Sequence, residues 1–338
     1  MSQFVFKMWR TPLAAICFLL STFLALPAQQ RSQNPPAKLI KSTSVVVNIY
    51  TTVEGSRKRP IRNLTEGDFE LTDDAAPQKI EYFSPETNAP LSLGIALDTS
   101  VSQAHILATE QAAADKFLSS VLQSGDQAFV MSFDVDVKLL QDFTGTPAKL
   151  MQAVDSAEIN QTGKSVLRLN GASSTGGTHL YDAVYLASNE VMKERHGREV
   201  LVLVTDGEDQ GSKIDLQKSV EAAEQANVIV YSIIVNDPEF YSLMGASYHG
   251  YARVRELANL TGGRTIRVQS AGQIGQAFGE IEQELRSQYR LGYSPSNLRH
   301  DGSFHRIHLK IRGHNYAIRA RSGYYDMGVE SAPKSPVK

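Results

Sequence analysis

Polar side chains follow directly on an apolar segment in the first third of the chain. The segment LSLGIALDTSVS, residues 91–102, is apolar at first and ends with Asp98, Ser100 and Ser102 among its polar residues. An acid at the edge of a core is costly to bury unless a partner compensates it. The partner can be a cation, the free N–H groups of a helix N-terminus, or a base that activates a serine.

Two further places in the chain carry polar residues of the same kind. Thr178 follows two glycines in STGGTHLYDAV, before a predicted helix, and Asp206 follows the most apolar predicted strand, in VLVLVTDGED. In an open parallel sheet, ligands bind outside the carboxyl ends of the strands, where the strand order reverses. A strand order of 3-2-1-4-5-6 places Asp98 and Asp206 at the ends of the first and fourth strands, on either side of that crevice.

The candidate ligands all offer oxygen, and they are Asp98, Ser100, Ser102, Thr178 and Asp206. Carboxylates and hydroxyls suit Mg²⁺, with Ca²⁺ or Mn²⁺ as alternatives, and they do not suit zinc. Together they neutralise a divalent cation without saturating it, so one position stays open for water or for a partner's carboxylate. A helix N-cap explains the first segment alone, but it leaves Thr178 and Asp206 without a role.

At these residues the chain resembles the von Willebrand factor A (VWA) domain with its metal-ion-dependent adhesion site. That family's pattern is Asp-x-Ser-x-Ser, a separate Thr, and a separate Asp followed by Gly. The resemblance implies that the two serines and Thr178 ligate the ion and that the acids act directly or through water. Val101 departs from the pattern, since many members carry Gly there. The segments on both sides of the domain are similar to a secreted VWA-related subgroup of Acidobacterial type.

The predicted fold has two parts. Over residues 89–286, apolar strands alternate with helical patterns, which predicts an α/β fold: a doubly wound, mostly parallel sheet with helices on both faces. β-type patterns flank this domain at 41–88 and 287–328, and each flank has too few strands to be stable alone. We therefore expect the flanks to pair into one small β-sandwich into which the VWA-like domain is inserted.

The N-terminus has the pattern of a targeting segment. Positive charges, a short apolar stretch and a small residue at a cleavage point predict a signal peptide over 1–28, followed by a linker at 29–40. The apolar stretch is shorter than a bilayer span, which favours a cleaved signal over the alternative, a retained anchor. After cleavage no stable membrane span is expected. We therefore expect export through the Sec route to the periplasm or beyond. The tail, 329–338, is predicted to be disordered.

Composition excludes several classes of function. The formal net charge is −2, so the chain has no overall positive field for nucleic acid or acidic lipid. The only cysteine lies inside the predicted signal peptide, and this excludes disulfides and thiolate metal sites in a cleaved protein. The histidines at 300, 305 and 308 suggest a metal cluster, but an odd spacing on a strand separates 305 from 308. Surface histidines are the prediction there.

The sequence favours an exported, non-enzymatic protein that binds a protein or peptide partner through the cation. A partner Asp or Glu would complete the coordination, and a rim around the ion would select the partner. The predicted rim residues are His179, Glu208, Phe240, Tyr241 and Tyr248.

Two alternatives to the binding protein stay open. One is a structural or assembly subunit whose metal only stabilises the fold. The other is a hydrolase built from Ser100, His179 and Asp206, although no G-x-S-x-G turn surrounds Ser100.

Overall fold

The computed structural model describes residues 46–85, 90–160, 177–195, 197–235, 250–296 and 298–326. The predicted signal peptide at 1–28, the linker at 29–40 and the tail at 329–338 lie outside these ranges. So do three of the predicted rim residues, Phe240, Tyr241 and Tyr248.

The central sheet contains six strands in the order β10-β9-β8-β5-β6-β7. Their bounds are β5 Leu91–Asp98, β6 Gln127–Phe133, β7 Val137–Thr144, β8 Arg198–Thr205, β9 Ile229–Val235 and β10 Thr265–Val268. All neighbours pair in parallel except β7, which pairs antiparallel with β6. Counted along the chain the order is 3-2-1-4-5-6, so the predicted α/β fold class is confirmed.

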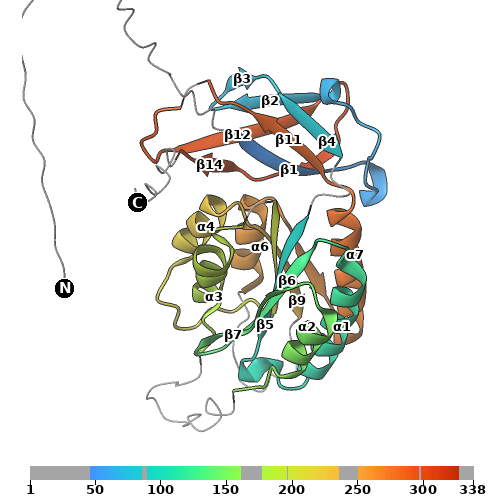
Figure 1. Ribbon diagram of the computed structural model, residues 1–338, viewed down its shortest axis with the longest axis vertical. Helices are drawn as coiled ribbons and strands as arrows, with labels where there is room; N and C mark the ends of the chain where they lie inside the picture. The colour runs from blue at the N-terminus through green and yellow to red at the C-terminus, as the bar shows by residue number, and fades with distance from the viewer. Residues whose placement is uncertain are drawn as a thin grey trace, which may run out of the picture. The chain divides into compact units, whose positions relative to one another are not determined.

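Helices cover both faces of this sheet (Figure 1). One face carries α1 Leu107–Val121, α2 Pro147–Asp155 and α7 Ile274–Leu285; the other carries α3 Leu180–Leu186, α4 Leu216–Gln225 and α6 Gly250–Leu260. A π-helical turn, Ala187–Met192, continues α3. Ile95 packs in the core on the α1 side and Ala96 in the core on the α3 side. Because both faces are buried, the strands are apolar at nearly every position.

The flanking segments form two four-stranded sheets, ordered β13-β1-β11-β4 and β14-β12-β2-β3. Their bounds are β1 Val47–Glu54, β2 Phe69–Asp73, β3 Ala76–Gln78, β4 Tyr82–Pro85, β11 Tyr289–Tyr293, β12 Phe304–Ile311, β13 Ala317–Arg319 and β14 Gly323–Tyr325. Short 3₁₀ turns span Ser56–Lys58, Glu66–Asp68, Val101–Gln103 and Ala271–Gln273. Each sheet combines strands from before and after the α/β domain, and one apolar core lies between them.

Strand β12 alternates between the sandwich core and the surface. Ile307, Leu309 and Ile311 point inward, and His308 is exposed. His305 also points inward and is only 3% exposed. The prediction of surface histidines is therefore wrong for His305, because the period-2 pattern of the strand places it on the buried face.

Within the described ranges, no helix combines the length and the apolarity that crossing a bilayer requires.

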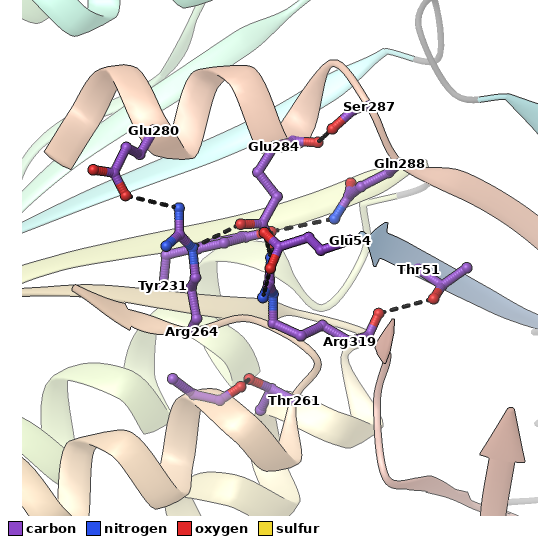
Figure 2. Close-up of polar contacts among 11 residues, drawn as sticks. Thr51, Glu54, Tyr231, Thr261, Arg264, Glu280, Glu284, Ser287, Gln288 and Arg319 are labelled. Atoms are coloured by element: carbon purple, nitrogen blue, oxygen red, sulfur yellow. Dashed lines mark hydrogen bonds and ion pairs between the residues drawn. The ribbon is translucent and has the colours of Figure 1, made fainter. Parts of the chain in front are cut away.

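A buried ion network joins β13 and β1 of the sandwich to α7 of the α/β domain (Figure 2). The Arg319 guanidinium donates to both carboxylate oxygens of Glu54, at 3.0 and 2.6 Å, and to Glu284 Oε1 at 3.0 Å. Arg264 donates to the other oxygen of Glu284 at 2.7 Å. Burial alone would raise the pKa of Glu54, but the bonds and charge of Arg319 outweigh it and lower that pKa.

Replacing Arg319 by Met should destabilise the protein by about 3–5 kcal/mol, because it leaves the buried Glu54 and Glu284 carboxylates without their shared partner. Urea unfolding of the full chain measures the loss. Arg312→Met is the matched control, since its ion pair with Glu70 is exposed on both sides and should contribute less than about 1 kcal/mol. Equal losses for the two variants would contradict the assignment.

A second buried acid is Glu199, at the start of β8. Burial raises the pKa of its carboxyl from the ordinary 4.5 to about 8, and a backbone hydrogen bond offsets this only in part. The folded state therefore keeps a proton that the unfolded state releases above about pH 4.5.

Glu199 should accordingly make the free energy of unfolding fall as the pH rises from about 4.5 to about 8, because the unfolded chain binds fewer protons in that window. Glu199→Gln should flatten this dependence. Urea unfolding of both proteins at several pH values tests it, and two parallel curves would refute the assignment.

Candidate metal centre

The candidate centre lies where β5 and β8 end side by side. The parallel register pairs Leu97 with Val204, so Asp98 comes beside Thr205, and Asp206 follows one residue later. The Thr205 hydroxyl donates to Asp98 Oδ2 at 2.5 Å and accepts from the Gly207 N–H at 2.9 Å. The two predicted acids therefore leave neighbouring strands at the same edge of the sheet.

A chain of hydroxyl contacts connects the two acids. The Ser100 N–H donates to Asp98 Oδ1 at 2.9 Å, and the Ser100 and Ser102 hydroxyls lie 2.9 Å apart. The Ser102 hydroxyl donates to Asp206 Oδ2 at 2.5 Å. Ser100 precedes the 3₁₀ turn at 101–103 but makes no side-chain capping bond. The hydroxyls thus face the acids and do not serve as helix caps.

Thr178 reaches the same edge from a separate segment. It forms an isolated antiparallel bridge with Gln210, in which Thr178 N–H donates to Gln210 O at 3.0 Å and Gln210 N–H donates back at 2.9 Å. Thr178 is buried, and the bridge holds it against the loop that begins at Asp206. The structure therefore brings all five predicted ligands to one end of the sheet.

The two acids of the centre are buried. Asp98 and Asp206 are 0% and 1% exposed. Burial, and then the charge of Asp206, raise the pKa of Asp98 to about 7, while neutral partners at Ser100 and Thr205 lower it. Burial and the charges of both acids also raise the pKa of Glu110, which is fully buried in α1. Oxygen donors around unfavourable negative charge fit a hard divalent cation.

Four residues that support the centre were missed by the sequence patterns: Thr205, Gln103, Glu110 and Asp134. The Gln103 side-chain amide accepts from the Asp206 N–H at 3.0 Å and donates to Glu110 Oε1 at 3.2 Å. It thereby fixes the backbone of Asp206 to α1. Nothing in the local sequence indicates this contact, because Gln103 lies in a 3₁₀ turn with no periodic pattern.

Asp134 holds three segments together beside the centre. Its carboxylate accepts from the Thr99 hydroxyl at 2.7 Å and from Asn160 Nδ2 at 2.8 Å. Its backbone oxygen accepts from the His179 N–H at 2.7 Å. The sequence could have indicated Asp134, because it directly follows the apolar strand β6. Asp98 and Asp206 stand in the same way at the ends of β5 and β8.

The two described rim residues have local partners. His179 is the N-cap residue directly before α3, with its ring Nδ1 3.8 Å from Asp182. Glu208 accepts from the Gly250 N–H at 2.8 Å, at the start of α6. Gly207 is required here, since its φ is +87° and a Cβ would lie 3.1–3.2 Å from Ile234, Gly250 and Val254.

A hollow of about 540 Å³ borders the loop that follows Asp206. Acids and bases both line it, among them Glu208, Asp209, Lys213, Asp215 and Arg253. The mixed charge and the open form are suited to a polar partner segment, not to an enclosed small molecule.

The solved structures to which this chain is similar are distant from it in sequence. They include the conserved hypothetical protein BatB from Bacteroides thetaiotaomicron, which is 18% identical, with a TM-score of 0.44 over 58% of this chain and 97% of that one. Proximal thread matrix protein 1 from the mussel byssus is 13% identical, with a TM-score of 0.47 over 71% of this chain and 50% of that one. This chain thus spans half the length of the mussel protein.

A third structure is the vWF domain of the type V pili tip protein Mfa5 from Porphyromonas gingivalis. It is 12% identical, with a TM-score of 0.41 over 58% of this chain and 94% of that one. No curated protein matches this chain.

A family model gives a more direct comparison. Residues 93–208 match the model for the von Willebrand factor type A domain. This segment begins in β5, ends in the loop after β8 and includes the five predicted ligands. The family match supports a von Willebrand factor type A domain over this segment, and the observed strand order has the fold of that family.

Proposed function

We propose that this chain is an exported, non-enzymatic binding protein that recognises a protein or peptide partner through a divalent cation. The ion would be held by Asp98, Ser100, Ser102, Thr178 and Asp206. The observation that carries the proposal is the pair of fully buried acids, Asp98 and Asp206, joined by the hydroxyls of Ser100 and Ser102. Without a cation, this arrangement concentrates negative charge at the end of the sheet.

The donor set supports Mg²⁺ first, with Ca²⁺ or Mn²⁺ as alternatives. Every proposed ligand offers a carboxylate or hydroxyl oxygen, which are the donors that hard cations prefer. When bound, the ion supplies a positive centre that a carboxylate can approach. The hollow lined by Gly207, Glu208 and Asp209, the residues that directly follow Asp206, is where we place the partner.

A partner Asp or Glu is the proposed sixth ligand. Lys213 and Arg253 line the same hollow, so they can pair with further acids on the partner. Glu208 holds α6 through Gly250 and would shape the rim. Recognition by one ion and a polar hollow favours a short exposed segment of a protein or a peptide.

The contacts of the polar residues argue against a hydrolase. The Ser100 hydroxyl contacts Ser102, and the His179 ring lies near Asp182. A serine nucleophile needs its base within about 3.2 Å. The structural or assembly subunit is the second candidate, because buried acids at a metal site also stabilise a fold.

Asp98→Asn should abolish stabilisation by Mg²⁺, because the variant lacks one of the two carboxylates. For the wild type, Mg²⁺ at 100 times its Kd should add about 2.7 kcal/mol over EDTA. Thermal melts with Mg²⁺, Ca²⁺ or EDTA measure the difference. In EDTA the variant should be at least as stable as the wild type, since it removes repulsion between buried acids.

Asp136→Asn is the matched control, an exposed acid in the loop after β6, and it should respond to Mg²⁺ like the wild type. Coinciding melts of the wild type in Mg²⁺, Ca²⁺ and EDTA would refute the metal centre.

Peptides that carry one Asp or Glu should bind the full chain in Mg²⁺, and their Asn or Gln counterparts should not. An immobilised peptide array, probed in Mg²⁺ and in EDTA, measures the retained protein. The signal should fall at least tenfold in EDTA, with Asp98→Asn, and with the neutral peptides.

Other outcomes of the array separate the alternatives. A protein that Mg²⁺ stabilises but that no acidic peptide retains would support the structural subunit. Shortened peptides, detected by mass and lost with Ser100→Ala, would support the hydrolase.

A further inference from the structure

A second group of metal-binding side chains lies in the sandwich, away from the candidate centre. Asp73 ends β2, Asp74 begins the turn to β3, and His305 lies on the neighbouring strand β12. His305 Nδ1 is 3.3 Å from Asp73 Oδ1 and 3.1 Å from Asp74 Oδ2. One donor atom of each residue lies within 4.8 Å of the others.

These separations match those of ligands around one small cation. Zinc binds His nitrogen and carboxylate oxygen at about 2.0–2.2 Å, so neighbouring tetrahedral ligands lie about 3.3–3.6 Å apart. The two nitrogen–oxygen separations, 3.3 and 3.1 Å, are at or just below this range. A ring nitrogen with two carboxylates is a set that suits zinc better than magnesium.

Surrounding groups orient each acid toward the imidazole. Asp73 Oδ2 accepts from the hydroxyls of Tyr293 and Tyr324, each at 2.9 Å, which leaves Oδ1 facing His305. Asp74 Oδ1 accepts from the Arg306 N–H at 2.9 Å, which leaves Oδ2 facing His305. Such outer hydrogen bonds are typical of metal sites, where they fix the ligands in place.

The imidazole is held in the same way. Its ring stacks on Tyr324, with centroids 5.1 Å apart. Its other nitrogen, Nε2, lies 3.5 Å from Ser303 Oγ and 4.0 Å from Asp326 Oδ2. The Tyr324 stack and the Ser303 hydroxyl thus position the ring, while the Asp326 carboxylate lies nearby but beyond hydrogen-bond distance.

The turn at Asp74 serves the same placement. Asp74 and Ala75 both have positive φ, 47° and 67°, as a two-residue hairpin turn requires. This backbone brings the Asp74 carboxylate back toward β12. The Asp74 side chain is 42% exposed while those of Asp73 and His305 are 0% and 4% exposed, so the group opens to solvent on one side only.

The donor set also suits a cation in its charge. A divalent cation bound between Asp73 and Asp74 would balance both ligating carboxylates.

We propose that Asp73, Asp74 and His305 form a binding site for Zn²⁺ or a similar transition-metal cation, with water at the open position beside Asp74. The site joins β2 to β12, which belong to opposite ends of the chain. It would therefore stabilise the sandwich, independently of the ion proposed at Asp98.

The test uses the full chain with Asp98→Asn, so that the first centre does not contribute, and Zn²⁺ as the probe. Equilibrium dialysis at micromolar Zn²⁺ followed by elemental analysis should find one bound equivalent. Adding His305→Gln or Asp74→Asn should lower the Zn²⁺ affinity at least tenfold. His308→Gln, a neighbouring but exposed histidine on the same strand, should keep it.

Asp74→Asn removes the carboxylate ligand without disturbing the fold. The asparagine side-chain oxygen can still accept from the Arg306 N–H, and asparagine tolerates the positive φ of this position. Its melting temperature without zinc should equal that of its parent. The proposal is overturned if the parent binds no zinc, or if all three added variants bind zinc equally. Because Asp98 is already replaced, neither result bears on the first centre.

Discussion

The parallel pairing of β5 with β8 is the constraint on which the candidate centre depends. These strands lie at the middle of the sheet, where the order reverses. Their register places Asp98 beside Thr205 and brings Asp206 to the same edge. The hydroxyls of Ser100 and Ser102, the bridge at Thr178 and the amide of Gln103 are all organised around these two acids.

The protein buries several carboxylates, and it compensates them in different ways. Glu54 and Glu284 share the guanidinium of Arg319 (Figure 2), and its bonds and charge lower the pKa of Glu54. For Glu199 burial dominates, and its raised pKa favours the neutral form. Asp98 and Asp206 accept hydrogen bonds from neutral hydroxyl and N–H groups, and the charge of Asp206 raises the pKa of Asp98, which is why a cation is the compensation that we propose there.

The two proposed ions differ because their donors differ. The centre at the end of the sheet offers oxygen atoms only, whereas the cluster in the sandwich combines two carboxylates with one imidazole. Hard cations favour the first set and zinc favours the second. Both sites connect segments that are distant along the chain, so either ion would link folding to metal binding.

The patterns along the chain predicted the strand order, the mostly parallel sheet, the pairing of the two flanks and the five candidate ligands. They did so because apolar periodicity specifies each element, and an acid directly after a buried strand must lie at the strand's carboxyl end. Whether those five residues hold an ion stays a prediction.

Other contacts became visible only in the folded chain. His305 lies 232 residues after Asp73, and its neighbours follow from the register of β12 on β2 and from the turn at Asp74. Gln103 and Glu110 likewise meet Asp206 only through the packing of α1. Local patterns define an element and its buried face, but they carry no information on which side chains of distant elements come within hydrogen-bond distance. That depends on register and turn geometry.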